Sequence, residues 1–346
     1  MTNINAEPES YFLEKDGHKT HYLAAGPEEG PLILFLHGWP ELAISWRSQL
    51  PCLAYLGYRA IAPDMRGYGQ SSVYTAHSAY QLELIVEDML NLLEHLGRKA
   101  AIWVGHDWGS PVVWSIASHH PNCCKAIASL CVPYQSVELG IDALVRSVDR
   151  DVYPEQEFPA GQWEYMRFYE ENFQRATSQM DVNPDHFIKL IFRQGNPSGA
   201  GQPAATAFTR IQNGWFGGQT EPPDSTIDEA VIQPEELILY AQALSHNGFF
   251  GPNSWYMNHQ LNFEYAQRSV NGGKLDMPVL FIAARYDYTC EAITPPLGTK
   301  MRQSCSRLSE TIIDSGHWMA QEKPIEVNQA LCHWLDTQTQ ALTEIK

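Results

Sequence analysis

The sequence of 346 residues has few basic side chains and no long apolar run. It contains 23 Lys and Arg against 40 Asp and Glu, which gives a formal net charge of -17. Nucleic acids and anionic membrane surfaces are bound through clustered Lys and Arg, so this balance argues against both as partners. No apolar stretch approaches the ~18 residues that a membrane helix needs. We therefore expect no nucleic acid partner and no membrane insertion.

Features of secreted proteins are also missing. The seven cysteines form no Cys-x-x-Cys pair, and their odd number cannot pair completely within one chain. There is no Asn-x-Ser/Thr sequon, and residues 1–4 lack the basic-then-apolar pattern of a signal peptide. Reduced cysteines without an export signal predict a cytoplasmic location.

Signals for a bound cofactor are absent as well. No group of His, Cys, Asp or Glu has the spacing of metal ligands in the sequence. The glycines at positions 67 and 69 lack the third glycine and the helix of a phosphate-binding loop. Neither a metal nor another cofactor is expected.

What the chain does contain is the composition and alternation of an α/β protein. Its 44% hydrophobic and 18% charged residues are typical of a globular chain with a large core. An Asp-Gly turn signal at residues 16–17 predicts an N-terminal hairpin. Apolar runs suited to buried strands occur at residues 32–36, 59–62, 101–104 and 126–130, with a helical pattern at 80–96. Strands that alternate with helices predict a parallel sheet covered by helices.

This alternation stops after Pro133 and resumes near the C-terminal end of the sequence. The later elements are predicted as a strand at residues 277–283, a strand at 311–313 and a helix at 325–335. Residues 136–270 are helical, aromatic and rich in loop residues, so we interpret them as an inserted second module. The predicted core is therefore residues 1–135 and 271–346.

The motif with the clearest chemical meaning is Gly-His-Asp-Trp-Gly at residues 105–109, directly after the strand at 101–104. It has the form of the nucleophile elbow Gly-x-Ser-x-Gly, with Asp107 in the place of Ser. The glycines are needed because a tight strand-to-helix turn leaves no room for a Cβ beside the raised side chain. A carboxylate attacks without a base, but its product is an ester that water must then cleave. The plainer alternative is that this pentapeptide is only a turn.

Cleavage of such an ester needs a general base with an orienting partner. In elbow enzymes the chain order is nucleophile, acid and His. Asp287 follows the strand at 277–283, and His317 follows the last strand, so both stand in that order. The carboxyl ends of strands in open α/β sheets are where sites assemble. We predict that Asp107, Asp287 and His317 form one catalytic group.

A third part of the predicted site is the loop that begins with His-Gly-Trp-Pro at residues 37–40. Elbow enzymes hold an oxyanion with the N–H after the nucleophile and an N–H from the loop after an earlier strand. The backbone amides of Trp108 and Trp39 are the candidates. Gly38 and Pro40 can also simply turn the chain, and a turn of this kind would aim the Trp39 amide.

These motifs together resemble the epoxide hydrolases of the α/β-hydrolase fold, and the chain is similar to the hydrolase domain of soluble epoxide hydrolases. The resemblance covers nearly the whole length, through residues 37–41, 64–72, 105–109, 315–318 and 323–328. It implies an α/β-hydrolase core, a mostly parallel sheet of about eight strands with flanking helices, and an inserted helical cap at residues 136–270. The expected partners are a small apolar epoxide and water, and monomer and dimer are equally compatible with the sequence.

The resemblance also implies a pair of cap tyrosines that act on the epoxide oxygen. Tyr165 in Trp-Glu-Tyr-Met and Tyr256 in Asn-Ser-Trp-Tyr-Met-Asn stand in family-like contexts, with Tyr169 as an alternative one helical turn after Tyr165. A phenol O–H can donate to developing alkoxide charge without bringing charge into an apolar cavity. The substrate pocket is expected to include Trp39, Trp108, Met166 and Trp318. The family often has Phe and Gln where this chain has Trp39 and Met166, so we expect a different pocket shape.

The implied reaction has two steps. Asp107 attacks an epoxide carbon while the tyrosines hold the oxygen, and His317, oriented by Asp287, then activates water against the ester. One alternative is a haloalkane dehalogenase, in which the indole N–H of Trp108 would hold halide. Another is a non-catalytic receptor for a small ligand on the same scaffold.

Other charged residues are expected to have structural roles. Asp64 and Arg66 are interpreted as a charged pair that holds the loop after the strand at 59–62, and His106 as a buried hydrogen-bonding residue. Residues 136–270 contain 18 acidic and 8 basic residues, yet none lies within 241–263, the stretch that holds Tyr256. This distribution predicts a cap with acidic side chains toward solvent and a neutral face toward the site.

Overall fold

Eight strands form one sheet in the order β1-β2-β4-β3-β5-β6-β7-β8 in the computed structural model, which describes residues 6–294 and 296–343. The hairpin of β1 and β2 is antiparallel, as is the pair of β2 and β4, and the other neighbours are parallel. The expected mostly parallel sheet of about eight strands is confirmed. The strands are β1 (Glu9–Lys15), β2 (His18–Ala25), β3 (Leu32–Leu36), β4 (Arg59–Pro63), β5 (Ala101–His106), β6 (Cys124–Leu130), β7 (Val279–Ala284) and β8 (Leu308–Ile313).

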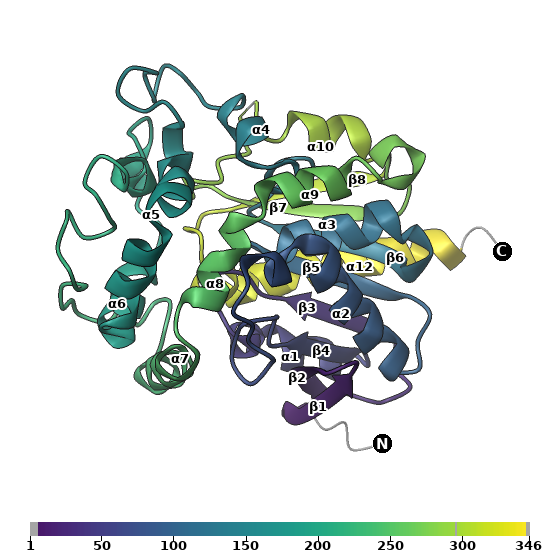
Figure 1. The fold of residues 1–346 in the computed structure, drawn as a ribbon. Helices are drawn as coiled ribbons and strands as arrows, with labels where there is room; N and C mark the ends of the chain where they lie inside the picture. The colour runs from purple at the N-terminus through teal and green to yellow at the C-terminus, as the bar shows by residue number, and fades with distance from the viewer. Residues whose placement is uncertain (1–5, 295, 344–346) are drawn as a thin grey trace.

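Helices cover both faces of this sheet (Figure 1). Every residue of β3, β5 and β7 is buried, as a strand covered on both faces requires. Helices α2 and α3 pack together in front of the sheet in the view of Figure 1, and α1 and α12 pack together behind it. The core helices are α1 (Gln49–Tyr55), α2 (Leu82–His95), α3 (Gly109–His119), α10 (Thr299–Ser304), α11 (Met319–Glu322) and α12 (Pro324–Thr343).

Between β6 and β7 the chain leaves the sheet and forms six further helices (Figure 1). These are α4 (Ile141–Val145), α5 (Glu164–Asp181), α6 (Pro184–Ile191), α7 (Pro234–Asn247), α8 (Phe250–Ser254) and α9 (His259–Ala266). Residues 192–233 contain only short 3-10 turns, because Gly and Pro interrupt regular structure there. The module boundaries at 136 and 270 stay a prediction. None of the helices in the described residues is long and apolar enough to cross a membrane.

The C-terminal elements begin and end differently from the sequence prediction. Strand β8 begins at Leu308, three residues before the predicted 311, because this edge strand alternates partly buried and exposed residues and has no continuous apolar run. Helix α12 continues to Thr343 beyond the predicted 335, since no Gly or Pro follows to end it.

The predicted pair of Asp64 and Arg66 does not form. Arg66 makes a bidentate ion pair with Asp88 of α2, with both N···O distances at 2.7 Å. Asp64 instead accepts hydrogen bonds from His21 at 2.7 Å and from the Ala43 amide at 2.9 Å. Both side chains are buried and structural, but each holds a different part of the chain.

Candidate functional site

The turn between β5 and α3 raises Asp107 at the carboxyl end of the sheet. Asp107 has a φ of 48°, which an L residue adopts only where the surroundings hold it. A Cβ placed on Gly105 would lie 2.4 Å from the Gly109 carbonyl oxygen, and one on Gly109 would lie 2.0 Å from the Leu36 oxygen. The predicted need for both glycines is confirmed, since any side chain there would open the turn.

Asp107, Asp287 and His317 meet although they follow three different strands. The His317 Nδ1–H donates to Asp287 Oδ2 at 2.6 Å, and His317 Nε2 lies 3.5 Å from Asp107 Oδ2. Asp287 Oδ1 accepts from the backbone amides of Thr289 and Cys290 at 3.2 and 3.0 Å. Asp287 is therefore fixed by its own loop, and the imidazole bridges two carboxylates.

The opposite charges of His317 and Asp287 shift the pKa values of these two residues in opposite directions. Burial alone would lower the pKa of His317, but the Asp287 charge and the hydrogen bonds to Asp107 and Asp287 outweigh it and raise the pKa well above 6.5. Burial alone would raise the pKa of Asp287, but the His317 charge and hydrogen bond lower it overall. With both carboxylates ionised, the imidazole is therefore held in its charged form.

Two backbone amides flank the Asp107 carboxylate. The Trp39 N–H donates to Asp107 Oδ1 at 2.6 Å. A Cβ on Gly38 would lie 2.3 Å from the same oxygen and 2.6 Å from the Trp108 nitrogen, so only glycine allows this approach. The two amides predicted as oxyanion donors are thus both beside the carboxylate.

Tyr165 and Tyr256 face the same cavity as Asp107. Their ring centroids are 5.5 Å apart, and within the described part of the chain neither hydroxyl has a hydrogen-bond partner. Burial raises both pKa values well above 10, so both phenols stay protonated. Tyr169, the alternative, is not among the cavity residues, and its hydroxyl accepts from the Trp215 indole at 3.0 Å. This geometry agrees with Tyr165 as the first cap tyrosine, which stays a prediction.

The cavity has a volume of about 410 Å³ and a mainly apolar wall. Trp39 and Trp318 line it as predicted. Met166 and Trp108 do not, and here the prediction is wrong. Met166 follows Tyr165 by one position on α5, so it points about 100° away and is buried in the helix packing. The Trp108 indole packs edge-on against Tyr256, with centroids 5.1 Å apart.

Several cavity residues have no signal in the sequence. Leu190, Ile191, Arg193, Ala205, Thr206, Trp215, Thr289 and Cys290 line the wall with the predicted residues. Six of the eight come from residues 190–215, where Leu190 and Ile191 end helix α6 and the other four lie in the irregular segment that follows. The uncharged stretch at 241–263 contributes only Tyr256, although all of residues 251–256 are buried. The prediction that the cap presents a neutral face to the site is therefore wrong, because the half-buried Arg193 brings a cation to the cavity.

Behind the cavity lies a buried ion pair that sequence reasoning missed. Glu41 Oε2 accepts from His106 Nδ1 at 2.7 Å and from the Gly38 amide at 3.0 Å. Burial opposes both charges, but their mutual attraction lowers the pKa of Glu41 to about 2 and raises that of His106 to about 10. His106 was predicted to be buried and hydrogen-bonded, which is confirmed. Glu41 follows the His-Gly-Trp-Pro motif, but its partner lies 65 residues away.

Comparison with known proteins gives consistent matches. A family model described as alpha/beta hydrolase fold matches residues 31–324. Epoxide hydrolase A of Mycobacterium tuberculosis is 33% identical, with 95% of this chain and 97% of the relative covered. Bifunctional epoxide hydrolase 2 of Sus scrofa is 31% identical over 94% of this chain, but the match spans only 55% of that relative. The chain thus spans about half the length of such bifunctional relatives.

A solved structure agrees with these sequence matches. The crystal structure of Epoxide Hydrolase A from Mycobacterium thermoresistibile has a TM-score of 0.77 and 29% sequence identity, with 95% of this chain and 98% of that chain covered. The similarity therefore includes both the sheet and the inserted helices.

Proposed function

Because the chain belongs to the epoxide hydrolases of the α/β-hydrolase fold, we propose that it converts epoxides to vicinal diols through a covalent ester on Asp107. The observation that carries this proposal is that the Asp107 carboxylate shares one cavity with two phenol hydroxyls that have no partner in the described residues. The substrates are a small epoxide and water.

In the first step a carboxylate oxygen of Asp107 attacks a ring carbon. The bond to carbon forms as the ring C–O bond breaks, and its electron pair goes to the ring oxygen. Tyr165 and Tyr256 donate hydrogen bonds to that oxygen as charge develops, which needs no charged group in the apolar cavity. The proton that finally neutralises the alkoxide comes from the charged His317, relayed through the phenols. The products are a hydroxyalkyl ester and a neutral imidazole.

In the second step His317 becomes the base. Formation of the ester removes the hydrogen bond to the Asp107 carboxylate, one of the interactions that raise the His317 pKa, and so favours the neutral imidazole. It takes a proton from water, whose oxygen attacks the ester carbonyl. The amides of Trp39 and Trp108 hold the resulting oxyanion, and Asp287 holds the imidazolium. Collapse releases the diol and restores the Asp107 carboxylate.

Residues 136–270 serve as a cap in this proposal. They supply both phenols, and Asn253 anchors them to the core loop by accepting from the Trp39 indole at 2.9 Å. Such a cover keeps bulk water from the ester and strengthens the hydrogen bonds inside.

The hydrogen bonds that the indole N–H groups already make argue against a haloalkane dehalogenase. A halide site needs an indole N–H that points at the leaving group. Three indoles of the cavity wall already donate within the protein, those of Trp39 to Asn253, Trp215 to Tyr169 and Trp318 to the Ile191 carbonyl. Trp108 does not line the cavity. Halide release from chloroalkanes without diol formation from epoxides would favour the dehalogenase.

Isotope labelling tests the covalent route. In one turnover with excess enzyme in heavy-oxygen water, the first diol should carry unlabelled oxygen from Asp107, and the label should enter the carboxylate. Solvent oxygen in the first diol would mean direct attack by water. If Asp107→Asn retained full turnover, Asp107 would not be the nucleophile. If no epoxide were turned over but ligands still bound, the receptor alternative would be favoured.

A further inference from the structure

Glu322, at the end of helix α11, binds two backbone amides that belong to different parts of the chain. Its Oε2 accepts from the Gly316 amide at 2.7 Å and from the Gly195 amide at 3.1 Å. Gly316 directly precedes His317, whereas Gly195 lies within residues 136–270 and 127 residues before Glu322. One carboxylate oxygen therefore connects the proposed cap to the loop of the proposed base.

The two glycines also pack directly against each other. A Cβ on Gly195 would lie 2.4 Å from the Gly316 nitrogen, and one on Gly316 would lie 2.7 Å from the Gly195 nitrogen. The main chains can approach this closely only because neither position carries a side chain. Gly316 is buried, and a buried N–H group needs an acceptor. Glu322 supplies that acceptor.

The side chain of Trp318 connects the same two segments. Its indole N–H donates to the Ile191 carbonyl at 2.7 Å. Its ring stacks on Phe192, with ring centroids 4.2 Å apart and an interplanar angle of 6°. Residues 191–195 and 316–322 therefore form a joint at which the proposed cap is attached to the loop of the base.

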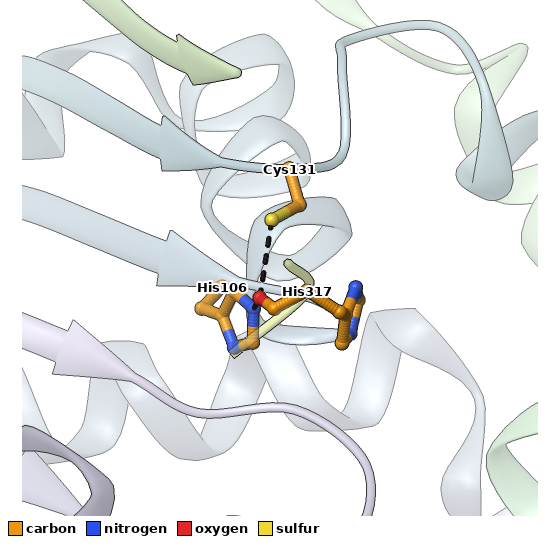
Figure 2. A group of neighbouring side chains, drawn as sticks. All are labelled: His106, Cys131 and His317. Atoms are coloured by element: carbon orange, nitrogen blue, oxygen red, sulfur yellow. Dashed lines mark hydrogen bonds between the residues drawn. The ribbon is translucent and has the colours of Figure 1, made fainter. Parts of the chain in front are cut away.

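The main chain of His317 is held on its other side by the core. Figure 2 shows Cys131 and His106 beside the His317 carbonyl. That oxygen accepts from His106 Nε2 at 2.8 Å and from the Cys131 thiol at 3.4 Å. The backbone is thus fixed after His317 by residues at the ends of β5 and β6, and before His317 by Glu322.

We propose that Glu322 is a positioning residue that aims the base His317 through the Gly316 amide. Through the Gly195 amide it also fixes the segment whose Ile191 and Arg193 line the cavity. Glu322 does not line the cavity itself, so it acts without contact with the substrate. The catalytic role rests on the proposed function, because His317 must be aimed at the water that cleaves the ester.

The first test measures the two chemical steps separately. Glu322→Ala removes the acceptor, Glu322→Gln keeps a neutral acceptor of the same size, and Glu326→Ala removes an exposed carboxylate of helix α12 as the matched control. Trp318 still holds the joint in each variant, so we expect all three to fold. Rapid quenching then gives the rates of ester formation and ester hydrolysis per active site, counted from the ester formed in the first turnover.

Ester hydrolysis in Glu322→Ala should fall by about 10–100-fold, the size expected when a catalytic group moves by about 1 Å, and ester formation should change less. Glu322→Gln should recover most of the rate, and Glu326→Ala should hydrolyse the ester at the native rate. A merely structural role would lower the number of active sites and leave both rate constants unchanged. That result, or an equal loss in Glu322→Gln and Glu322→Ala, would overturn the proposal.

Gly195→Ala tests the joint from the side of the cap. Its Cβ would press on the Gly316 nitrogen while Glu322 stays intact, and Gly195 has an ordinary φ that alanine can adopt. Hydrolysis should fall as it does in Glu322→Ala. The double variant should lose less than the product of the two single losses, since both changes act on one contact. Fully multiplicative losses would reject a shared joint.

Hydrogen–deuterium exchange tests the joint without any substrate. Amides in residues 191–196 and 314–318 should exchange faster in Glu322→Ala than in the native protein or Glu326→Ala. Unchanged exchange in both segments would reject the joint, and faster exchange with native ester hydrolysis would reject the positioning role. If exchange became faster but the native protein formed no ester, the proposed function would be rejected together with the catalytic role of Glu322, and the joint would stand.

Discussion

His106 donates a hydrogen bond through Nε2 to the main-chain carbonyl of His317, at 2.8 Å. The residue before the proposed nucleophile therefore holds the loop that carries the proposed base. Glu41 extends this connection to the oxyanion loop, because it accepts from both His106 and the Gly38 amide. One buried ion pair thus links the three loops of the site.

Glu41→Gln should destabilise the fold by about 3–5 kcal/mol, the usual cost of removing one partner from a buried ion pair. Chemical denaturation measures this loss. The pKa of His106 is raised to about 10, so its contribution is complete below about pH 6.5 and is lost as pH rises through 10. The pKa of Glu41 is lowered to about 2, so its contribution is complete above about pH 4.5 and is lost as pH falls toward 2. The difference between native protein and variant should be greatest between about pH 4.5 and 6.5. A difference that does not change with pH would contradict the charged pair.

Tyr165→Phe and Tyr256→Phe should each slow the formation of the ester by about 10²–10³-fold, the usual effect of losing one donor to a developing oxyanion. Stopped-flow tryptophan fluorescence can follow this step, because Trp39 and Trp215 lie beside the phenols. Tyr169→Phe is the matched control, since its hydroxyl contacts Trp215 and not the cavity. A large effect of Tyr169→Phe with a small one of Tyr165→Phe would reverse the assignment.

His317→Gln should trap the ester. The variant lacks the base for the second step, so its mass should increase by that of one epoxide, and peptide mapping should place the adduct on Asp107. Diol release should fall by at least the 10²–10⁴-fold typical of a lost general base. Free diol at the native rate, or an adduct on another residue, would reject the role of His317. Because the charged imidazole also supplies the ring-opening proton, slower formation of the ester is expected as well.

Arg193→Met should change the preference for substrate charge. Arg193 lines the cavity, and its guanidinium donates to the Ser225 hydroxyl at 2.8 Å, with no carboxylate within ion-pair distance in the described residues. It can therefore bind a carboxylate on the substrate, an interaction that contributes roughly 1.5–3 kcal/mol. We expect kcat/KM to fall about 10–100-fold for an epoxide with a carboxylate and to stay nearly constant for its methyl ester. Equal losses for both would indicate a packing role for Arg193.

Much of the fold follows from local signals. Apolar runs placed β3, β5 and β7 correctly, because a strand covered on both faces must be apolar throughout. The C-terminal elements were less well predicted. Strand β8 lies at an edge with mixed burial, and nothing in the sequence ends α12 near residue 335. The prediction that Asp64 pairs with Arg66 was wrong. Asp64 binds His21 and Arg66 binds Asp88, and both partners are brought close only by the tertiary structure.

The sequence by itself determined the chemical groups that meet at the site. Asp107, Asp287 and His317 each follow a strand, and strand ends on one edge of a parallel sheet converge whatever the loops contain. Only the tertiary structure decided which other side chains share their cavity. Met166 and Trp108 are not among the residues that line it, whereas Arg193 and Cys290 are. The physical reason is that the direction of a side chain on a helix or loop depends on packing between segments far apart in the chain, and no local pattern records that packing.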